Sequence, residues 1–170
     1  MITVVNLQRK VKIDSKAFRS YVDSLPIAIT EAAASTFSVA FISDRRMIEL
    51  NKFFRGKDST TDVLSFPHEP DEFDLISSPP YEEGTAAAST DGVVLPPFDE
   101  QSPGSSDFLG DIVISAEQAQ RQAKENKLTL ENEIKQLILH GLLHLCGYDH
   151  ETDDGEMNSR ELVLREQLSI

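Results

Sequence analysis

Alternating and helically spaced apolar residues divide the chain into short strands and amphipathic helices. Short apolar or alternating runs between turn residues predict strands at residues 2–6, 36–42, 63–66 and 110–114. Apolar residues at helical spacing predict helices from Asp14 or Ser15 to Pro26, from Asp44 to Gly56, from Ser115 to about Asn126, from Thr129 through Leu145, and from about Asp153 to Gln167. Strands mostly separated by helices, with the last helices together, indicate a small α+β or mixed α/β layer fold.

Polar and turn residues mark where these helices should begin and end. Asp44 and Thr129 are placed to cap helix N-termini with their side-chain oxygens. Ser115 and Gln118 have the spacing of a capping box. Pro26 should stop the first helix because proline has no backbone N–H, and Gly56 should end the second.

The helix that begins at Thr129 should be the central one. It is apolar nearly all round up to Leu145, a pattern typical of a buried helix. The last helix is amphipathic, and Met157, Leu162 and Leu164 are predicted to face the core.

An acidic, proline-rich segment interrupts the pattern at residues 68–107. It holds six of the eight prolines and ten acidic residues, with no lysine or arginine. Its low periodicity predicts an extended, mobile insertion in a chain that is otherwise one domain, 1–170. The insertion is either a solubilising loop or a flap near a basic surface.

Charge and composition narrow the function classes. The net charge of −13 argues by itself against a nucleic-acid partner, but without the insertion 19 acids face 16 bases, a net of −3. No apolar run reaches the roughly 20 residues that cross a bilayer, and the N-terminal basic residues follow the apolar patch, the reverse of a secretory signal. The lone cysteine fits a reducing compartment. We therefore expect a cytoplasmic protein that does not enter membranes.

Three of the four histidines fall within residues 140–150. His140 and His144 lie one helical turn apart, so their imidazoles share a face near the helix end. Gly147 can turn the chain so that His150 supplies a third nitrogen. Three neutral imidazoles suit zinc and leave a fourth position open for water, as in catalytic sites. Cys146 points to another side of the helix and is predicted to be a buried apolar residue.

The histidine spacing is also that of the metzincin peptidases, so a metallopeptidase is the first alternative. Those enzymes carry a glutamate directly after the first histidine as general base. Gly141 occupies that position and cannot take a proton.

Three sequence blocks resemble the YbeY family of bacterial metal-dependent endoribonucleases. Residues 140–150 (HGLLHLCGYDH) are similar to that family's defining block. Residues 55–67 (RGKDSTTDVLSFP) and 109–114 (LGDIVI) resemble two further blocks, and all three occur in family order. The insertion at 68–107 is a departure, since relatives have a shorter loop there.

The resemblance implies a fold, a metal and a substrate. The fold would be α+β, with a mixed sheet of about four strands and a central helix that carries the histidines. His140, His144 and His150 would hold one Zn²⁺ ion, and Arg55 and His140 are the predicted catalytic residues. The substrate would be single-stranded RNA, notably the 3′ end of 16S ribosomal RNA, in maturation and quality control of the small ribosomal subunit. No DNA substrate is expected.

The residues themselves support part of this implication. Basic residues gather between positions 44 and 57, where Arg45, Arg46, Lys52, Arg55 and Lys57 face only Asp44 and Glu49, a net of +3. This is either a phosphate-binding face or a solvated helix surface. Single-strand preference would call for aromatic stacking. Phe53, Phe54 and Tyr148 are candidates, but two of the three are predicted to be core residues.

Several roles stay open at this level. The proton acceptor is unassigned: metal-bound hydroxide, Asp149 or a route through the RNA's own 2′-hydroxyl stays open. Asp149 and Glu151 are also candidates to support the third ligand, to act as general base or to be solvated. Asp62 is predicted to brace a turn and His68 to be exposed. The second alternative is a non-catalytic ribosome-assembly factor with a structural zinc, although structural sites normally have four ligands.

Overall fold

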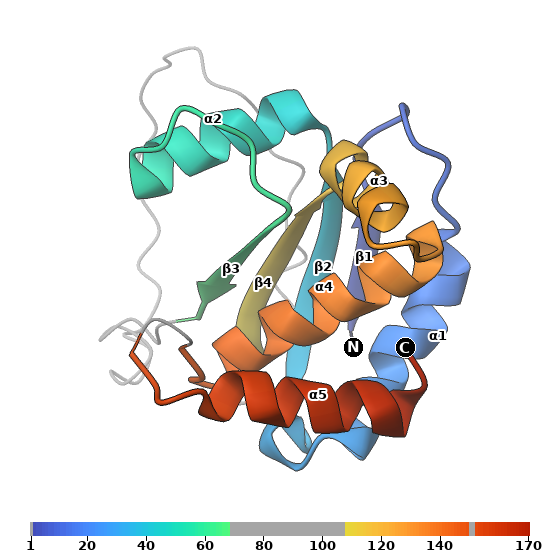
Figure 1. Cartoon of the computed structure of the whole chain (residues 1–170), viewed down its shortest axis with the longest axis vertical. Helices are drawn as coiled ribbons and strands as arrows, with labels where there is room; N and C mark the ends of the chain where they lie inside the picture. The colour runs from blue at the N-terminus through green and yellow to red at the C-terminus, as the bar shows by residue number, and fades with distance from the viewer. Residues whose placement is uncertain (1, 69–107, 150–151) are drawn as a thin grey trace, which may run out of the picture. The chain divides into compact units, whose positions relative to one another are not determined.

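A four-stranded mixed sheet forms the centre of the structure, a computed structural model that describes residues 2–68, 108–149 and 152–170. Its strands are β1 (Thr3–Asn6), β2 (Thr36–Ile42), β3 (Val63–Pro67) and β4 (Phe108–Ser115). They lie in the order β1-β2-β4-β3, with β1–β2 and β2–β4 parallel and β3 antiparallel to β4 (Figure 1). The predicted α+β fold with a small mixed sheet is confirmed.

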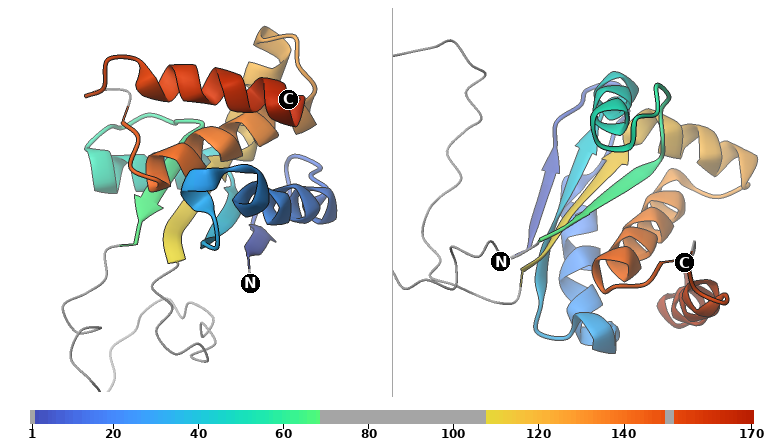
Figure 2. Two further views of the ribbon diagram at one scale, coloured as in Figure 1. Left: turned by 90° about the horizontal axis from the view of Figure 1, so that it is seen from below. Right: turned by 90° about the vertical axis from the view of Figure 1, so that its left-hand side faces the viewer.

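Five α-helices and one short 3-10 helix accompany the sheet in the described part of the chain. They are α1 (Ser15–Ala28), η1 (Thr30–Ala32), α2 (Asp44–Arg55), α3 (Ala116–Glu125), α4 (Leu130–Leu145) and α5 (Glu156–Leu168). Figure 2 shows α1 and α4 against one face of the sheet, with α5 on the far side of α4. Residues 2–68 and the described residues from 108 onward belong to one compact unit. The predicted insertion at residues 68–107 lies outside the described residues, except for His68.

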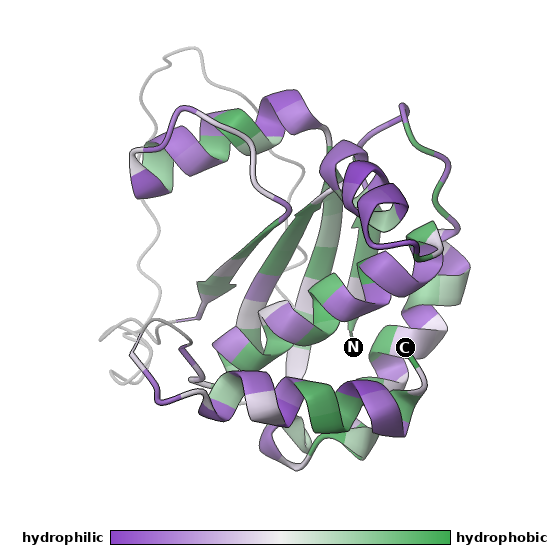
Figure 3. Cartoon of the chain, viewed as in Figure 1, coloured by the Kyte–Doolittle hydropathy of each residue, from purple (hydrophilic) through white to green (hydrophobic). Residues whose placement is uncertain are grey.

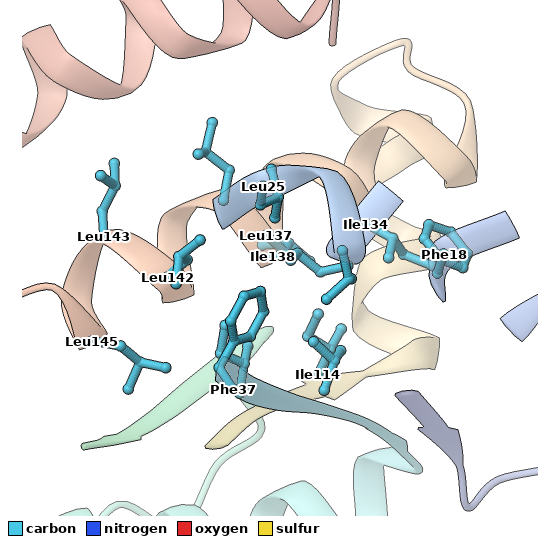
Figure 4. Packing of buried hydrophobic residues seen from close by; sticks show 14 of the residues in the cluster. Phe18, Leu25, Phe37, Ile114, Ile134, Leu137, Ile138, Leu142, Leu143 and Leu145 are labelled. Carbon is cyan, nitrogen blue, oxygen red and sulfur yellow. The ribbon is translucent and has the colours of Figure 1, made fainter. Parts of the chain in front are cut away.

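The main core lies between the sheet and the layer formed by α1 and α4. Phe37, Val39 and Phe41 alternate onto this face from β2, as the strand pattern predicted. Figure 4 shows Phe37 pointing toward the aliphatic side chains of α4. In Figure 3 the hydrophobic residues concentrate on the strands and along α4, while much of α3 is hydrophilic. The central position of α4 is confirmed.

A second, smaller core lies on the opposite face of the sheet. Met47 of α2 is fully buried there and packs with Ile42 and Leu64, which point away from the main core. Leu50 and Phe66 complete this cluster from its edge. The second core therefore fixes α2 beside β3 and β4.

Most of the predicted helix ends are confirmed. Asp14 caps α1 by accepting hydrogen bonds from the N–H groups of residues 16 and 17, and Thr129 caps α4 by accepting from Asn132 N at 3.1 Å. Gly56 ends α2 in the left-handed region, with a φ of 66°. None of these ends needs a tertiary contact, so the local sequence suffices to predict them.

Two predicted helix ends are wrong, and a third is only partly as predicted. Asp44 does not cap α2; Ser43 does, and the Asp44 carboxylate instead accepts from Ser115 Oγ at 2.6 Å. Ser115 caps α3, but the capping box is incomplete because the Ser115 N–H donates to the Asp62 carbonyl at 2.8 Å. Helix α1 continues through Pro26 to Ala28, because a fully buried residue, Ile29, holds the last turn against the core.

The inward face of α5 was also predicted partly wrong. Met157 and Leu164 are buried as expected, but Leu162 is 57% exposed. Glu161 takes the inward position and is buried at 7% exposure. A buried carboxylate needs polar partners, and those of Glu161 lie in the candidate site.

Helix α4 crosses the sheet at very short range where Gly141 faces β3 and β4. A Cβ atom at Gly141 would lie 2.8 Å from Ile112 Cγ2 and 3.1 Å from Ser65 Oγ. Ser65 Oγ also donates a hydrogen bond to the Gly141 carbonyl at 3.2 Å. Any side chain at this position would force the helix away from the sheet.

In the described part of the chain, none of the helices combines the length and apolarity that crossing a bilayer requires.

Replacing Gly141 with alanine should therefore destabilise the protein. Glycine to alanine inside a helix normally stabilises by about 1 kcal/mol, but overpacking here should reverse the sign and cost about 1–3 kcal/mol. Urea unfolding followed by circular dichroism measures the difference. The matched control compares Ser20→Gly with Ser20→Ala on the exposed side of α1, where alanine should be the more stable. A stabilised Gly141→Ala variant would contradict the close packing.

Candidate functional site

Two histidines project from the last turns of α4 toward a common point. The Nε2 atoms of His140 and His144 lie 3.2 Å apart, and their ring planes are inclined at 80°. The spacing of four residues places both rings on one helix face, as predicted from the sequence. The third predicted ligand, His150, lies outside the described residues.

The other ring nitrogens determine which atoms face each other. His144 Nδ1 lies 2.9 Å from the carbonyl oxygen of Tyr148, which can only accept a hydrogen bond. His140 Nδ1 lies 3.0 Å from Glu161 Oε2. Both Nδ1 atoms are thus placed to carry the proton, so that in the neutral rings the lone pairs are on the two Nε2 atoms.

Glu161 is held as a carboxylate by its surroundings. Burial opposes its ionisation, but the hydrogen bond from His140 and the guanidinium of Arg165 outweigh burial, and the pKa of the carboxyl is lowered. An ionised Glu161 accepts the proton of His140 Nδ1 and orients the ring. Sequence reasoning missed this residue because it predicted Leu162, the next position, to face inward.

The geometry of the pair suits a cation. Two nitrogen lone pairs that face each other repel unless a positive centre lies between them. Nitrogen ligands about 2.0–2.1 Å from a tetrahedral zinc ion are about 3.3 Å apart, close to the 3.2 Å found here. A carboxylate and a backbone carbonyl behind the two imidazoles are also usual at metal sites.

A groove along β3 brings the histidine pair together with Arg55. It has a volume of about 510 Å³, and its walls include Arg55 at the end of α2, Ser65 and Pro67 on β3, and both histidines. Figure 1 shows the end of α2 and the end of α4 on the same side of the molecule, flanking the edge strand β3. Residues far apart in the sequence therefore share one surface, as the predicted catalytic pair Arg55 and His140 requires.

Ion pairs neutralise most of the basic residues between positions 44 and 57, but not Arg55 or Lys57. Glu49 pairs with Arg45 at 3.5 Å and with Arg46 at 2.9 Å, and Asp58 pairs with Lys52 at 2.8 Å. Within the described residues, no ion pair is formed by Arg55 or by Lys57, and both are exposed. The phosphate-binding potential of the segment thus concentrates beside the groove.

Comparison with known proteins assigns the chain to a family. The sequence model described as Endoribonuclease YbeY matches residues 3–169. The chain belongs to this family. The Endoribonuclease YbeY of Alkaliphilus metalliredigens is 33% identical over 175 residues, covering 99% of this chain and 96% of the relative. That of Sulfurovum sp. is 35% identical over 173 residues, covering 100% of this chain and 94% of the relative.

A solved structure supports the fold. The solution structure of TM1509 from Thermotoga maritima aligns with a TM-score of 0.55 at 25% identity, covering 99% of this chain and 89% of that one. Membership of the YbeY family makes the protein an endoribonuclease, a hydrolase that acts on RNA. The metallopeptidase alternative loses its support, and the tight packing at Gly141 leaves no room in this chain for the peptidase glutamate.

The loop after α4 is tied to two other elements. Tyr148, whose carbonyl holds His144, donates its hydroxyl to Glu31 Oε1 at 3.0 Å. Arg160 of α5 donates to both oxygens of Glu31, at 2.7 and 2.9 Å. Glu31 thus supports the site from η1, and nothing in its local sequence indicated this role.

Of the other predicted residues, Asp62 and His68 lie where the sequence placed them, whereas Cys146 is less buried than predicted. Asp62 braces its turn by accepting from Val63 N at 2.8 Å and Gln122 Nε2 at 3.1 Å. Cys146 is half-buried against the core, and burial raises the pKa of its thiol to about 11. Asp149 lines the groove and His68 is exposed, whereas Glu151 is outside the described residues.

The prediction that two of the three candidate aromatic residues are core residues is wrong. Phe53 is 80% exposed and Phe54 is 57% exposed, whereas Tyr148 is half-buried against the main core. The helical spacing of α2 turns Met47 and Leu50 inward instead.

The contribution of Glu31 to stability should depend on pH. The hydrogen bond from Arg160 lowers the pKa of Glu31 from its ordinary 4.5 to about 2. A lowered carboxyl pKa stabilises the fold above the unfolded value and loses this effect as the pH falls through the folded value. Glu31→Gln should therefore cost up to about 1 kcal/mol at pH 6, since the pair is partly exposed. The difference from the wild type should shrink as the pH falls below 4.5 and should be lost below about pH 2.

Urea unfolding at a series of pH values measures this difference. A cost that stays constant from pH 6 to pH 2 would show that the ionised carboxylate is not what stabilises the loop.

Proposed function

We propose that this protein is a metal-dependent endoribonuclease that cleaves single-stranded RNA during maturation of the 16S ribosomal RNA 3′ end. The observation that carries the proposal is the convergence of His140 Nε2 and His144 Nε2 in the groove that Arg55 lines. It combines two ring nitrogens, whose lone pairs in the neutral imidazoles suit a metal, with a cation that suits a phosphate.

The metal of the proposal is one Zn²⁺ ion held by His140, His144 and His150. The tautomers set by Glu161 and by the Tyr148 carbonyl support this ligand set, because they direct both Nε2 lone pairs to one point. When bound, zinc would polarise a phosphoryl oxygen and activate water. An open fourth position is what distinguishes such a site from a structural zinc site.

Arg55 is the proposed partner of the scissile phosphate. Its guanidinium can donate two parallel hydrogen bonds to phosphate oxygens and oppose the negative charge that develops on them. Arg55 is exposed beside the groove, so it is available to an RNA strand that lies along β3.

The proton acceptor must come from a group other than residue 141. Asp149 is the carboxylate among the described groove residues; metal-bound hydroxide and a route through the RNA's own 2′-hydroxyl are the alternatives. An Asp149→Asn variant tests whether the carboxylate is needed, and a 2′-O-methyl group at the cleaved nucleotide tests the 2′-hydroxyl route, which it alone blocks.

The cellular setting of the proposal is the cytoplasm, with the small ribosomal subunit as partner and neither membrane nor DNA as a target. An accessible groove fits a single strand better than a wide duplex, and phosphate recognition by Arg55 matches an RNA backbone. The charge of the chain outside residues 68–107 is only −3, which such a substrate tolerates.

An assay panel tests the activity. The zinc-loaded protein should cleave single-stranded RNA, and should leave duplex RNA, the matching DNA and a peptide uncut. His144→Ala should abolish cleavage, and Arg55→Ala should lower kcat by about 10²–10³-fold. The matched control is Arg45→Ala, which removes the same charge from α2 at a position paired with Glu49 away from the groove, and should keep full activity.

Several outcomes would overturn the proposal. Unchanged cleavage in His144→Ala would identify a contaminating nuclease. Cleavage of the peptide alone would restore the metallopeptidase alternative. A zinc-loaded protein that binds ribosomal subunits but cuts no RNA would identify the non-catalytic assembly factor.

Glu161 provides a separate test of the metal. If it orients His140 as a zinc ligand, Glu161→Gln should weaken zinc binding by about 10–100-fold, measured by competition with a chromophoric chelator. Glu166→Gln is the control, since Glu166 is an exposed residue of the same helix. Equal zinc affinity in the two variants would argue against a metal at His140.

A further inference from the structure

An exposed aromatic cluster stands at the end of α2. Phe53 is 80% exposed and Phe54 is 57% exposed, although they are adjacent and large. The Phe54 ring contacts Phe53 at a centroid distance of 4.9 Å and Phe66 of β3 also at 4.9 Å, both edge to face. Phe66 belongs to the second core, so the outer two rings are anchored by a fixed one.

The cluster adjoins the groove of the candidate site. Arg55 follows Phe54 directly in the chain, Pro67 follows Phe66, and both Arg55 and Pro67 line the groove. The rings therefore lie next in the chain to two groove residues, on the face of the sheet that α2 covers. Lys57, another exposed cation without an ion pair in the described residues, comes directly after the glycine that ends α2.

We propose that Phe53 and Phe54 form a stacking platform for the unpaired bases of the RNA strand whose phosphate Arg55 contacts. This inference rests on the proposed function and names how the substrate is held outside the reacting centre. Aromatic faces beside cations are the combination that binds single strands, because bases stack on the rings while the cations contact phosphates.

The charge around the platform favours RNA over a protein partner. The centres of protein–protein interfaces are enriched in phenylalanine and arginine but depleted of lysine, so the exposed Lys57, four residues after Phe53, is the residue that favours RNA. The bases of a duplex stack on one another and are not exposed to such a platform. The platform thus supplies base contacts beside the groove that only a single strand can make.

The absence of tryptophan from the chain makes a direct test simple. Phe53→Trp introduces one fluorophore on the platform, and Ile27→Trp introduces one on α1 at a site that is 89% exposed. Titration uses a 2′-O-methyl oligoadenylate, which lacks the 2′-hydroxyl, and an abasic strand of the same length. We expect saturable fluorescence quenching of the Phe53→Trp variant by the oligoadenylate alone, and none for the Ile27→Trp control. Equal quenching by the abasic strand would overturn the stacking.

Kinetics test the platform independently. Phe53→Leu keeps apolar bulk but loses the ring, so KM for single-stranded RNA should rise about 5- to 100-fold with little change in kcat. Phe53→Tyr should restore the wild-type KM. An unchanged KM in a folded Phe53→Leu variant would refute the platform.

These experiments distinguish a failure of the proposed function from a failure of the stacking platform. A wild-type protein that cuts no RNA refutes the proposed function, while the fluorescence titration still decides the platform. Normal cleavage by Phe53→Leu refutes the platform alone. A change of oligomeric state in Phe53→Leu, without a change in RNA affinity, would assign the cluster to contact with another protein chain.

Discussion

The close contact between α4 and the sheet at Gly141 is the constraint on which the site depends. It lets the helix approach Ile112 and Ser65 with no side chain between them, and this approach fixes the height of His140 and His144 above the edge strand. The same residue therefore sets the position of the histidine pair and removes the carboxylate that a peptidase would carry beside its first ligand. Gly141 thus determines both how closely α4 packs on the sheet and the absence of a carboxylate beside His140.

Tertiary contacts then convert two histidines into a directed pair. A carboxylate from α5 and a carbonyl from the loop after α4 hold the Nδ1 atoms, and Glu31 holds that loop through Tyr148. Three separate segments thus determine the direction of two nitrogen atoms of α4. This over-determination resembles the layered support that precise metal and catalytic sites require.

The sequence was informative where a local pattern decides the outcome. The spacing of His140 and His144, the cap at Thr129 and the end of α2 at Gly56 follow from helix geometry alone. Predictions from the sequence were wrong where a residue from a distant element competes for the same group or packs against the helix end. Ser115 takes the Asp44 carboxylate away from capping, and the burial of Ile29 extends α1 past Pro26.

The supporting residues of the site show the same limit. Glu161 was not predicted, because a glutamate on an amphipathic helix is normally solvated and its partner lies on another helix. The exposed rings of Phe53 and Phe54 were not predicted either, because aromatic residues are usually buried and the direction of α2 is set by Met47. Both errors come from applying average burial to residues whose neighbours are distant in sequence.

The edge position of β3 has a consequence for what can enter the groove. An edge strand presents a row of backbone donors and acceptors that would pair with any extended polypeptide. Here that row borders the histidine pair, so the fold by itself would accept a peptide strand as readily as a polynucleotide. The strand has only five residues and ends at Pro67, which shortens the template. Discrimination between the two polymers thus falls to the side chains on the walls of the groove, among them Arg55, whose guanidinium suits a phosphate and has no such partner in a peptide backbone.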